Sequence, residues 1–369
     1  MKQLLFFAFS ALGLLIGHIS VYFLLMKVFS FSSSFSKAIL MLVISTLFLG
    51  VLLSSYLIHV KDNVLIRFLY IFFSLWLGVL LNLILIAIFL FLAKITLNCF
   101  NISISLLYYQ SSLIILTLLV SLLAVYRALV PTVVEYEAYI KDLPDAWDGK
   151  SIVHISDLHL GPVYRQNFIN NLVKRINSLE PEAVFISGDF FDGMEADFSW
   201  LDKPLSDLKT KKGVYYGFGN HDLYLGFEKV SKLMADKKLV ILDNKLIEVD
   251  GLQIIGINYS FRNDFDLEKE ILYQSGYDKS KASILIFHTP TNIDLAKKAG
   301  IDLQLSGHTH DGQLFPFNLP AKWMHDGYGY GIFKENGFNL VVSAGIGTWG
   351  PPMRTAARSE IVKILLKKQ

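Results

Sequence analysis

Aspartate, asparagine and histidine recur in short clusters after residue 150, each directly behind a stretch that reads as a strand. In chain order the clusters are Asp157-Leu158-His159, Gly188-Asp189-Phe190-Phe191-Asp192, Gly219-Asn220-His221-Asp222, His288 and Gly307-His308-Thr309-His310. Carboxylate and amide oxygens combined with imidazole nitrogens suit Mn, Fe, Zn and similar divalent ions. Loops at strand ends are where an open α/β sheet binds its ligands. The pattern therefore predicts a metal site assembled from separate loops.

The spacing within these clusters is compatible with two ions. Asp157 and His159 are separated by one residue, so both can reach the same ion. A carboxylate such as that of Asp189 can bridge two ions. Two divalent ions about 3.5–4 Å apart can hold a phosphoryl group and lower the pKa of a bound water until it becomes a nucleophile. Phosphoryl transfer needs mostly positioning and charge neutralisation, which two cations supply. The chemistry predicted is hydrolysis of a phosphoester.

Each cluster alone is a weak indicator. An Asp-x-His sequence occurs by chance in many chains, and Gly-Asn-His can be a turn that carries a surface histidine. A lone histidine such as His288 is more often satisfied by the protein than bound to an ion. Glycines precede Asp189, Asn220 and His308, where they allow tight turns that bring the backbone close to an ion. We attribute a function to the clusters because all five occur together, in order, each at a strand end.

Short strands alternate with amphipathic helices from residue 151 onward. Strands are predicted at 151–156, 183–187, 214–218, 246–249, 252–258, 283–288, 301–305, 338–343 and 360–366, and helices at 166–178, 227–236 and 292–299. The Asp250-Gly251 pair between two of the strands predicts a hairpin. This alternation is typical of a layered α/β domain. At about 220–240 residues, the domain is large enough to bury a substantial core.

The N-terminal third of the 369-residue chain has a different composition. Residues 1–130 contain one acidic residue, Asp62, and seven basic residues, whereas the rest holds 31 acidic and 27 basic residues. Four charge-free apolar stretches lie at 4–26, 38–58, 68–93 and 102–126. Since about 20 apolar residues cross a bilayer core as a helix, we predict a transmembrane anchor of about four helices over 1–130. Residues 131–150 would be a linker and the first segment of the catalytic domain, and 151–369 the rest of it.

The anchor predicts a multi-pass protein of the inner or cell membrane. A cleaved signal peptide is the alternative for the first stretch, but the stretch is long and more spans follow it. Four spans place both termini on one side, and a basic-residue count of four against three favours a cytoplasmic catalytic domain. Within the spans, His18 and Asn82 could mark a transport path or form a hydrogen bond between helices. The single Cys99 excludes an internal disulfide framework.

The order D-x-H, G-D-x-x-D, G-N-H-D, H, G-H-T-H resembles the calcineurin-like metallophosphoesterase superfamily over roughly residues 132–369. The closer resemblance is to its bacterial membrane-anchored phosphodiesterases. This resemblance implies a sandwich of two sheets flanked by helices, with four layers in the order αββα. One departure is visible, because the related enzymes usually read G-H-T-H-G-G-Q and this chain has Asp311 after His310. No ligand position is lost.

Residue by residue, the resemblance implies two metal sites that share Asp189. One ion would be bound by Asp157, His159, Asp189 and His310, and the other by Asp189, Asn220, His288 and His308. His221 would not be a ligand but the general acid towards the leaving oxygen, or a group that stabilises the phosphate. Asp192 would hold His221 in its tautomer and raise the pKa of that imidazole.

Two features near the C-terminus bear on the substrate. Arg354 could neutralise a substrate phosphate or form a surface ion pair. Trp323, Met324, Tyr328 and Tyr330 could form an apolar lip for a lipid-like substrate, or pack as an ordinary loop. The expected partners are thus the lipid bilayer and a phosphoester, with lipid-linked substrates favoured by the anchor.

Two other functions are compatible with the sequence. One is a membrane sensor or scaffold that binds a phosphate ligand without turnover, against which the intact metal and acid positions argue. The other is an anchored nuclease. The net charge of −4 after residue 130 argues against nucleic acid as a partner.

Overall fold

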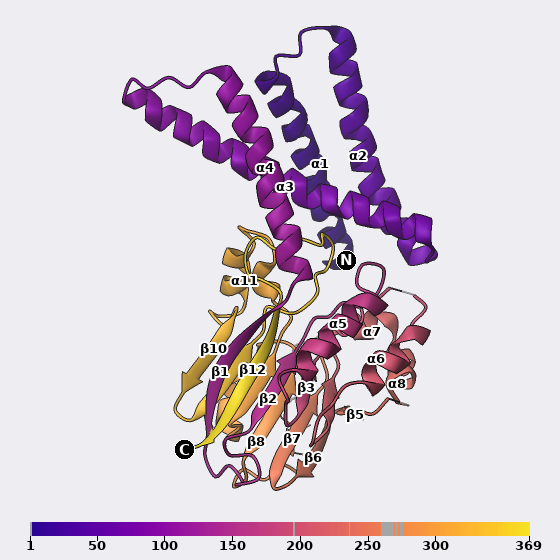
Figure 1. Cartoon of the computed structure of the whole chain (residues 1–369), viewed down its shortest axis with the longest axis vertical. Coiled ribbons are helices and arrows are strands. Elements are labelled where there is room, and N and C mark those ends of the chain that lie inside the picture. The colour runs from indigo at the N-terminus through magenta and orange to yellow at the C-terminus, as the bar shows by residue number, and fades with distance from the viewer. Residues whose placement is uncertain (1, 195, 236, 260–268, 270–271, 274–275) are drawn as a thin grey trace. The chain divides into compact units, whose positions relative to one another are not determined.

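A computed structural model describes residues 2–194, 196–235, 237–259, 269, 272–273 and 276–369 of the chain. Contacts divide the protein into two compact units. The helical unit holds the residues up to 126 together with 350–353, and the sheet unit holds 127–349 together with 354–369. Figure 1 traces the chain from the indigo N-terminal helices to the yellow C-terminal strand.

Four long apolar helices make up the helical unit. They are α1 (Lys2–Val28), α2 (Ser34–Val60), α3 (Val64–Cys99) and α4 (Leu106–Leu129), the last of which ends in the sheet unit. All four are long and apolar enough to cross a membrane, since a rise of about 1.5 Å per residue carries even 20 residues across a bilayer core of about 30 Å. Side chains cap two of the helices, because Ser33 accepts from the amide of Ser36 and Asn63 from that of Ile66. The prediction of four apolar helices is confirmed.

The two polar residues singled out within these helices are both hydrogen-bonded. His18 Nε2 accepts from the Trp76 indole at 2.9 Å, and its Nδ1 donates to the Leu14 carbonyl at 2.8 Å. Asn82 donates to the Ser121 hydroxyl at 3.0 Å. The bonds of His18 to Trp76 and of Asn82 to Ser121 each join two helices, and the bond of His18 to Leu14 lies within one helix. The structure therefore supports hydrogen bonding between helices as the role of these two residues, in preference to a transport path.

Two six-stranded mixed sheets form the centre of the sheet unit. The first sheet has the order β1 (Thr132–Ile140), β12 (Glu360–Lys368), β2 (Ser151–Ile155), β3 (Val184–Ser187), β4 (Val214–Gly217) and β5 (Val240–Ile241). The second has the order β10 (Gly331–Glu335), β11 (Phe338–Val342), β9 (Leu303–Ser306), β8 (Ser283–Phe287), β7 (Leu252–Ile257) and β6 (Lys245–Val249). A buried apolar cluster drawn from both sheets, with Phe185 and Ile284 among its members, fills the space between them.

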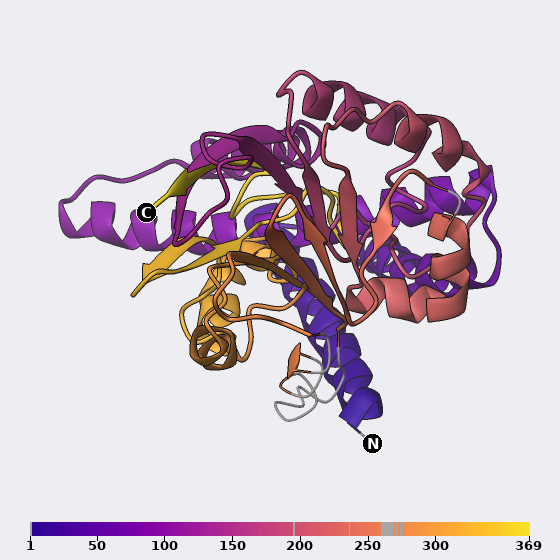
Figure 2. The ribbon, with the colours of Figure 1, turned by 90° about the horizontal axis from the view of Figure 1, so that it is seen from below.

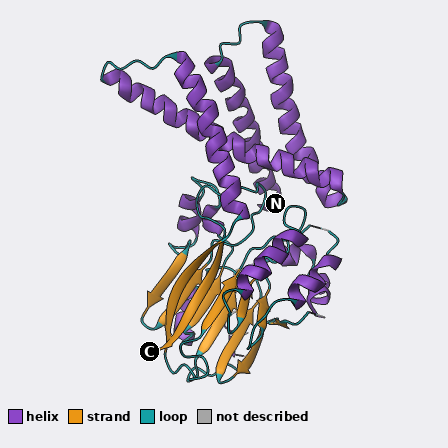
Figure 3. Ribbon diagram, in the orientation of Figure 1, coloured by secondary structure: helices purple, strands orange, loops and turns teal. Residues whose placement is uncertain are grey.

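Helices cover the outer face of each sheet (Figure 2). The helices α5 (Gln166–Asn177), α6 (Asp202–Ser206) and α8 (Phe227–Ala235) pack on the first sheet through a second apolar cluster. The helix α10 (Ile293–Ala299) packs on the other sheet through a third. Among the described residues, the other short helices are η1 (Ser199–Leu201), α7 (Asn220–Leu225), η2 (His310–Gly312) and α11 (Asn318–Met324). The four-layer αββα architecture expected from the resemblance is confirmed, and Figure 3 shows the sheets between their helices.

The predicted strands and helices of the sheet unit lie within two residues of their observed bounds, but the sequence did not predict β1, β5, β10, α6, α7, α11, η1 or η2. The hairpin between β6 and β7 is confirmed, with Asp250 and Gly251 at φ 48° and 82°. For the segments that form the strands β1 and β10 and the helix α11, the sequence predicts a linker or a loop. Both strands lie at sheet edges, and only two of the nine residues of β1 are buried, so their sequences lack the apolar run of a central strand.

Strand directions place the ends of β2, β3 and β4 beside the start of β1. β1 and β12 run parallel, with Thr132 opposite Glu360, and β12 runs antiparallel to β2. β3 and β4 run parallel to β2. The loops that follow these three strands therefore gather at the end of the sheet unit where the chain arrives from α4.

Candidate metal centre

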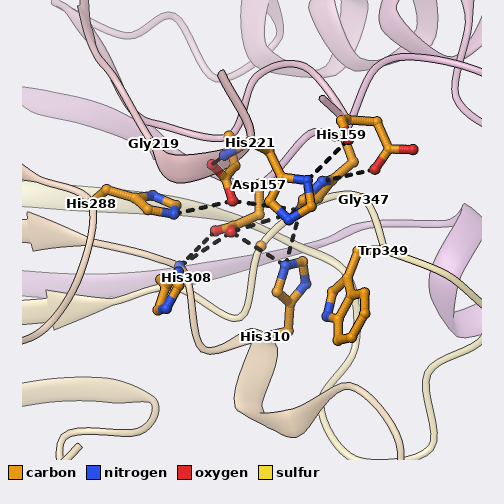
Figure 4. A network of polar contacts seen from close by, with 12 residues as sticks. Asp157, His159, Gly219, His221, His288, His308, His310, Gly347 and Trp349 are labelled. Atoms are coloured by element: carbon orange, nitrogen blue, oxygen red, sulfur yellow. Dashed lines mark hydrogen bonds and ion pairs between the residues drawn. The ribbon is translucent and has the colours of Figure 1, made fainter. Parts of the chain in front are cut away.

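All seven predicted metal ligands meet at this end of the two sheets. Asp157 and His159 follow β2, Asp189 follows β3 and Asn220 follows β4, whereas His288 follows β8, and His308 and His310 follow β9. Two trios have ligand atoms within 4.8 Å of one another, namely Asp157–His159–His310 and Asp189–His288–His308. Figure 4 shows His159, His288, His308 and His310 arranged around Asp157. The structure thus brings together residues up to 153 positions apart in the sequence.

The backbone at the centre adopts a conformation that is rare for residues with side chains. Five predicted ligands have positive φ, namely Asp157 at 52°, His159 at 48°, Asp189 at 51°, His308 at 71° and His310 at 51°. Left-handed conformations of this kind cost about 1–3 kcal/mol each and cluster at functional sites. These five residues lie in the loops that follow β2, β3 and β9. Their left-handed conformation ends the extended course of the strand and turns their side chains towards the centre.

Glycines beside the ligands serve two different needs. Gly188, at φ 88°, makes the turn that precedes Asp189. Gly219 has an ordinary extended conformation, but a Cβ atom there would lie 2.2 Å from Asp189 Oδ1. A Cβ on Gly307 would likewise lie 2.2 Å from Asp157 Oδ2. The expected tight turn is therefore found at Gly188, while Gly219 and Gly307 are needed for space.

The first trio is buried and electrostatically coupled. His310 Nε2 lies 3.3 Å from Asp157 Oδ1 and 3.0 Å from His159 Nε2. Burial acts to raise the pKa of Asp157, but His310, His288 and His159 together hold that pKa well below its ordinary range. Burial lowers the pKa of His310 to about 4, so its imidazole is neutral, as a metal ligand must be. Two imidazole nitrogens 3.0 Å apart fit a shared cation, since metal–nitrogen bonds are about 2.0–2.1 Å long.

The second trio is linked to the first through Asp189. Asp189 Oδ2 lies 3.1 Å from His288 Nε2 and 4.0 Å from His159 Nε2. Burial acts to raise the pKa of Asp189, yet His288, His221 and His159 lower it below its ordinary range. His288 Nδ1 donates to the Ser187 carbonyl at 2.7 Å, which turns Nε2 towards the carboxylate. The position of Asp189 between both trios is the one that a bridging carboxylate requires.

Asn220 gives a further indication that a cation belongs here. Its Oδ1 atom is buried and meets no hydrogen-bond donor in the part of the chain that the structure describes. A buried carbonyl oxygen without a partner costs about 1–3 kcal/mol, and a bound ion would remove that cost. Burial lowers the pKa of His308 to about 3, so this residue too offers a neutral imidazole. The donor set therefore fits metal ions.

The expected contact between the Asp192 carboxylate and His221 is wrong. Asp192 Oδ1 lies 3.2 Å from Nδ1 of His159, while His221 Nδ1 donates to the Asp192 backbone carbonyl at 3.0 Å. The physical reason is that the Asp192 amide donates to Leu160 O, which pins this residue alongside the loop that carries His159. The Asp192 side chain thus orients a predicted metal ligand, and its carbonyl orients His221.

His221 lies at the margin of the centre. Its backbone amide donates to Asp189 Oδ1 at 2.8 Å, and its imidazole forms a third ligand-capable trio with His159 and Asp189. Geometry therefore allows His221 to be a ligand or to act on the substrate. Its assignment as a general acid that binds no metal stays a prediction.

Arg354 has neither of the two expected roles. Its side chain is fully buried, so it forms no surface ion pair and is not open to a substrate phosphate. Its Nη2 donates to the carbonyls of Ala344 at 2.7 Å and Gly347 at 2.6 Å, and the same nitrogen lies 3.2 Å from His310 Nδ1. Arg354 therefore holds the loop at 344–347 against the back of His310.

Two carboxylates whose roles the sequence did not indicate support the loops. Asp222 is buried and accepts from the amides of Phe191 at 3.0 Å and Gly219 at 2.9 Å, which ties the loop after β3 to the loop after β4. Burial raises the pKa of Asp222 to about 7. Glu360 accepts from the Ala344 amide and the Tyr330 hydroxyl. Asp222 stood in the G-N-H-D cluster and could have been suspected, but no signal marked Glu360.

Comparison with known proteins agrees with this geometry. A family model described as calcineurin-like phosphoesterase matches residues 150–312. A Campylobacter jejuni protein named an uncharacterized metallophosphoesterase is 33% identical over 70% of each chain. A Helicobacter pylori protein of the same description is 37% identical over 59% of this chain and 60% of its own. A Danio rerio transmembrane protein with a metallophosphoesterase domain is 33% identical over 68% of this chain and 62% of its own.

The match thus spans about 60% of the length of the Helicobacter and Danio relatives. The family model covers residues 150–312 and therefore includes all five clusters up to His310. Together with the apolar helices and the assembled ligand set, these findings show that the chain is a membrane protein that belongs to the calcineurin-like metallophosphoesterase family.

Proposed function

We propose that this protein is an enzyme that hydrolyses phosphoesters with two divalent ions such as Mn, Fe or Zn. Asp157, His159, Asp189 and His310 would hold one ion, and Asp189, Asn220, His288 and His308 the other. The single observation that carries the proposal is the place of Asp189, whose carboxylate lies 3.1 Å from His288 and 4.0 Å from His159. Bound ions would supply an activated water and neutralise phosphoryl charge.

The protein's own residues have distinct tasks in this reaction. Asp192 Oδ1 lies 3.2 Å from Nδ1 of His159 and can accept its proton, so that Nε2 of this ring faces the centre, and Arg354 holds the backbone of His310 by donating to its carbonyl at 3.5 Å. His221 donates from Nδ1 to the Asp192 carbonyl, which leaves Nε2 to carry the proton that a leaving oxygen needs. Because the ligand set is complete, turnover is favoured over a sensor that only binds phosphate.

The apolar helices would keep the enzyme at the inner or cell membrane, with its sheet unit in the cytoplasm. Such an anchor favours membrane-associated phosphoesters as substrates and disfavours nucleic acid. A reporter enzyme fused after Gln369 tests the sidedness. Strong activity of an alkaline phosphatase fusion, which requires export, would place the sheet unit outside the cytoplasm.

The test of the proposed activity uses the full chain, purified in detergent and reconstituted with Mn²⁺, Fe²⁺ or Zn²⁺. We expect about two metal equivalents and metal-dependent hydrolysis of a panel of phosphate monoesters and diesters. Asp294→Asn is a matched control, because Asp294 is an exposed carboxylate on α10 that is not part of the centre. Active protein with a stoichiometry that stays near one would refute the two-ion centre, and fully loaded protein without hydrolysis of any ester would refute the enzyme.

A further inference from the structure

An exposed apolar surface follows the last metal-ligand cluster. It comprises Phe315, Phe317, Leu319, Trp323 and Met324, of which Trp323 is 82% exposed and Met324 69%. We call it the α11 surface, since three of its residues lie on that seven-residue helix. Five exposed large apolar side chains within ten residues are unusual on a soluble domain, where exposed apolar surface marks an interaction site. Leu319 and Trp323 are one helical turn apart and so share a face.

The two tyrosines that had been grouped with this segment do not belong to the surface. The Tyr328 hydroxyl donates to Glu335 at 2.9 Å, and the Tyr330 hydroxyl donates to Glu360 at 2.8 Å. Both side chains are thus held against the sheet unit. The expectation of ordinary loop packing describes these tyrosines but not Trp323 and Met324.

The α11 surface is fixed to the segment that also receives the chain from the apolar helices. The Phe315 amide donates to the Thr355 hydroxyl at 2.8 Å, and the Thr355 amide donates to Gln313 O at 3.0 Å. Arg127, in the last turn of α4, donates to the carbonyls of Thr355 at 3.2 Å and Ala356 at 2.7 Å. All of these residues belong to the sheet unit, so their arrangement does not depend on where the other helices lie.

The metal centre lies at the same end. Strand register places the loops after β2, β3 and β4 beside Thr132, and only Val130 and Pro131 separate this residue from the end of α4. Two residues extend by at most about 7 Å, so this end of the sheet unit cannot move far from an apolar helix that ends in a bilayer interface. In Figure 1, α11 lies at the end of the sheets opposite the C-terminus.

We propose that the α11 surface inserts into the interface of the lipid bilayer and thereby presents the metal centre to phosphoesters in lipid head groups. Tryptophan, leucine, phenylalanine and methionine next to an exposed lysine, Lys322, are the side chains that interfacial helices use. The bilayer is the partner because the covalent tether keeps it within reach at all times. The choice of substrate rests on the proposed hydrolase function, whereas the insertion does not.

The insertion is tested with spin labels. Cys99 is the sole cysteine of the sequence, so Cys99→Ser gives a background in which Leu319→Cys, Trp323→Cys and the control Tyr139→Cys can each be labelled. Tyr139 is an exposed aromatic residue at the far end of β1, opposite Lys367. The full chain is placed in phosphatidylcholine–phosphatidylglycerol nanodiscs, and collisions with oxygen are compared with those of a nickel chelate.

We expect the labels at 319 and 323 to collide more with oxygen, which concentrates in lipid, and the label at 139 to collide more with the nickel chelate. Water-like behaviour at all three positions would overturn the insertion, and would point to a protein partner for the surface.

A second measurement tests the substrate class. Trp323→Ser and Met324→Ser should keep the metal content and the hydrolysis of nitrophenyl phosphate, while hydrolysis of phosphatidic acid in vesicles falls several-fold. Equal losses on both substrates would overturn the presentation role. If the wild type hydrolyses neither substrate, the proposed hydrolase fails, and the spin labels still decide whether the surface inserts.

Discussion

Both units of this protein bury histidines, but they satisfy them differently. In the helical unit, His18 uses one ring nitrogen to accept from Trp76 and the other to donate to Leu14. In the sheet unit, the Nε2 atoms of His159, His288 and His310 point at carboxylates and at one another. Burial alone therefore does not indicate a functional histidine. What distinguishes the metal centre is that several imidazoles and two buried carboxylates converge on one another, whereas His18 is satisfied by a single donor and a single acceptor.

The backbone conformation also differs between the two units. The apolar helices satisfy their own amides and carbonyls and have regular conformations. Five ligand residues of the metal centre have left-handed φ values, and Asn220 Oδ1 is buried without a partner among the described residues. The helical unit thus satisfies its own polar groups, whereas the centre holds strained backbone and a buried oxygen that a cation would compensate. Substitutions should then act through metal in one unit and through packing in the other.

Asp189→Asn should have the largest effect, because this carboxylate lies 3.1 Å from His288 and 4.0 Å from His159 and is the proposed bridge between two ions. We expect the loss of both ions and of hydrolysis, and a smaller loss for Asp157→Asn, whose carboxylate is assigned to one ion. Metal analysis and kcat/KM measure the effect, with Asp294→Asn as the control. If Asp189→Asn keeps wild-type metal content and rate, its carboxylate does not bridge.

His221→Asn should keep both metals while kcat falls by about 10²–10⁴-fold, the range of general acid catalysis. The loss should be larger for alkyl esters than for nitrophenyl esters, whose leaving oxygen hardly needs a proton. Loss of a metal would instead make His221 a ligand, which its distance to His159 and Asp189 permits. Equal losses for good and poor leaving groups would indicate a role in binding phosphate.

Asp192→Ala and Arg354→Lys should weaken metal binding by about 10–100-fold, as the loss of a group that orients a metal ligand typically does. The reason is that Asp192 holds His159 and Arg354 holds His310. Metal titration of the detergent-solubilised protein measures the effect, and Asp192→Asn, which can still accept from His159, should be milder. A leaving-group dependence without a change in metal affinity would show that Asp192 acts through His221 after all.

The metal-free protein should lose stability as the pH rises from about 6.5 to 9. Burial acts to lower the pKa of His288, but Asp189 and its neighbours raise it to about 9. A histidine whose pKa is higher in the folded state stabilises the fold below its unfolded pKa of about 6.5, and this contribution disappears as the pH passes the folded pKa. Thermal unfolding at both pH values, with and without chelator, measures this change in stability. A chelated sample that is equally stable at both pH values would contradict the prediction.

His18→Phe should have the smallest effect. It removes the hydrogen bond from Trp76, a net contribution of about 0.5–1.5 kcal/mol, and leaves metal content and kinetics unchanged. Unfolding of the helices in mild detergent measures the loss. A fall in metal content for this variant would break the distinction between the two units.

The pattern of residues predicted the seven candidate ligands that meet in the structure, but it did not predict the groups behind them. The seven predicted ligands each follow a strand, which is a local property of the sequence, and they meet in the structure. The partners of Asp192 and Arg354 were predicted wrongly because each contact joins loops far apart in the chain. Arg354 and His310 are separated by 44 positions, and Asp192 and His159 by 33, so no local pattern indicates either pair.

By itself the sequence determined the four apolar helices and the alternation of strands and helices, because hydropathy and strand–loop alternation are set by neighbouring residues, while its resemblance to the family supplied the αββα layers and the candidate metal ligands. Tertiary structure decided which carboxylate faces which imidazole, that Arg354 is buried, and that Trp323 is exposed beside the place where the chain leaves α4. These outcomes depend on strand register, and register is settled only when β1, β12 and β2 pair across more than 200 residues of chain.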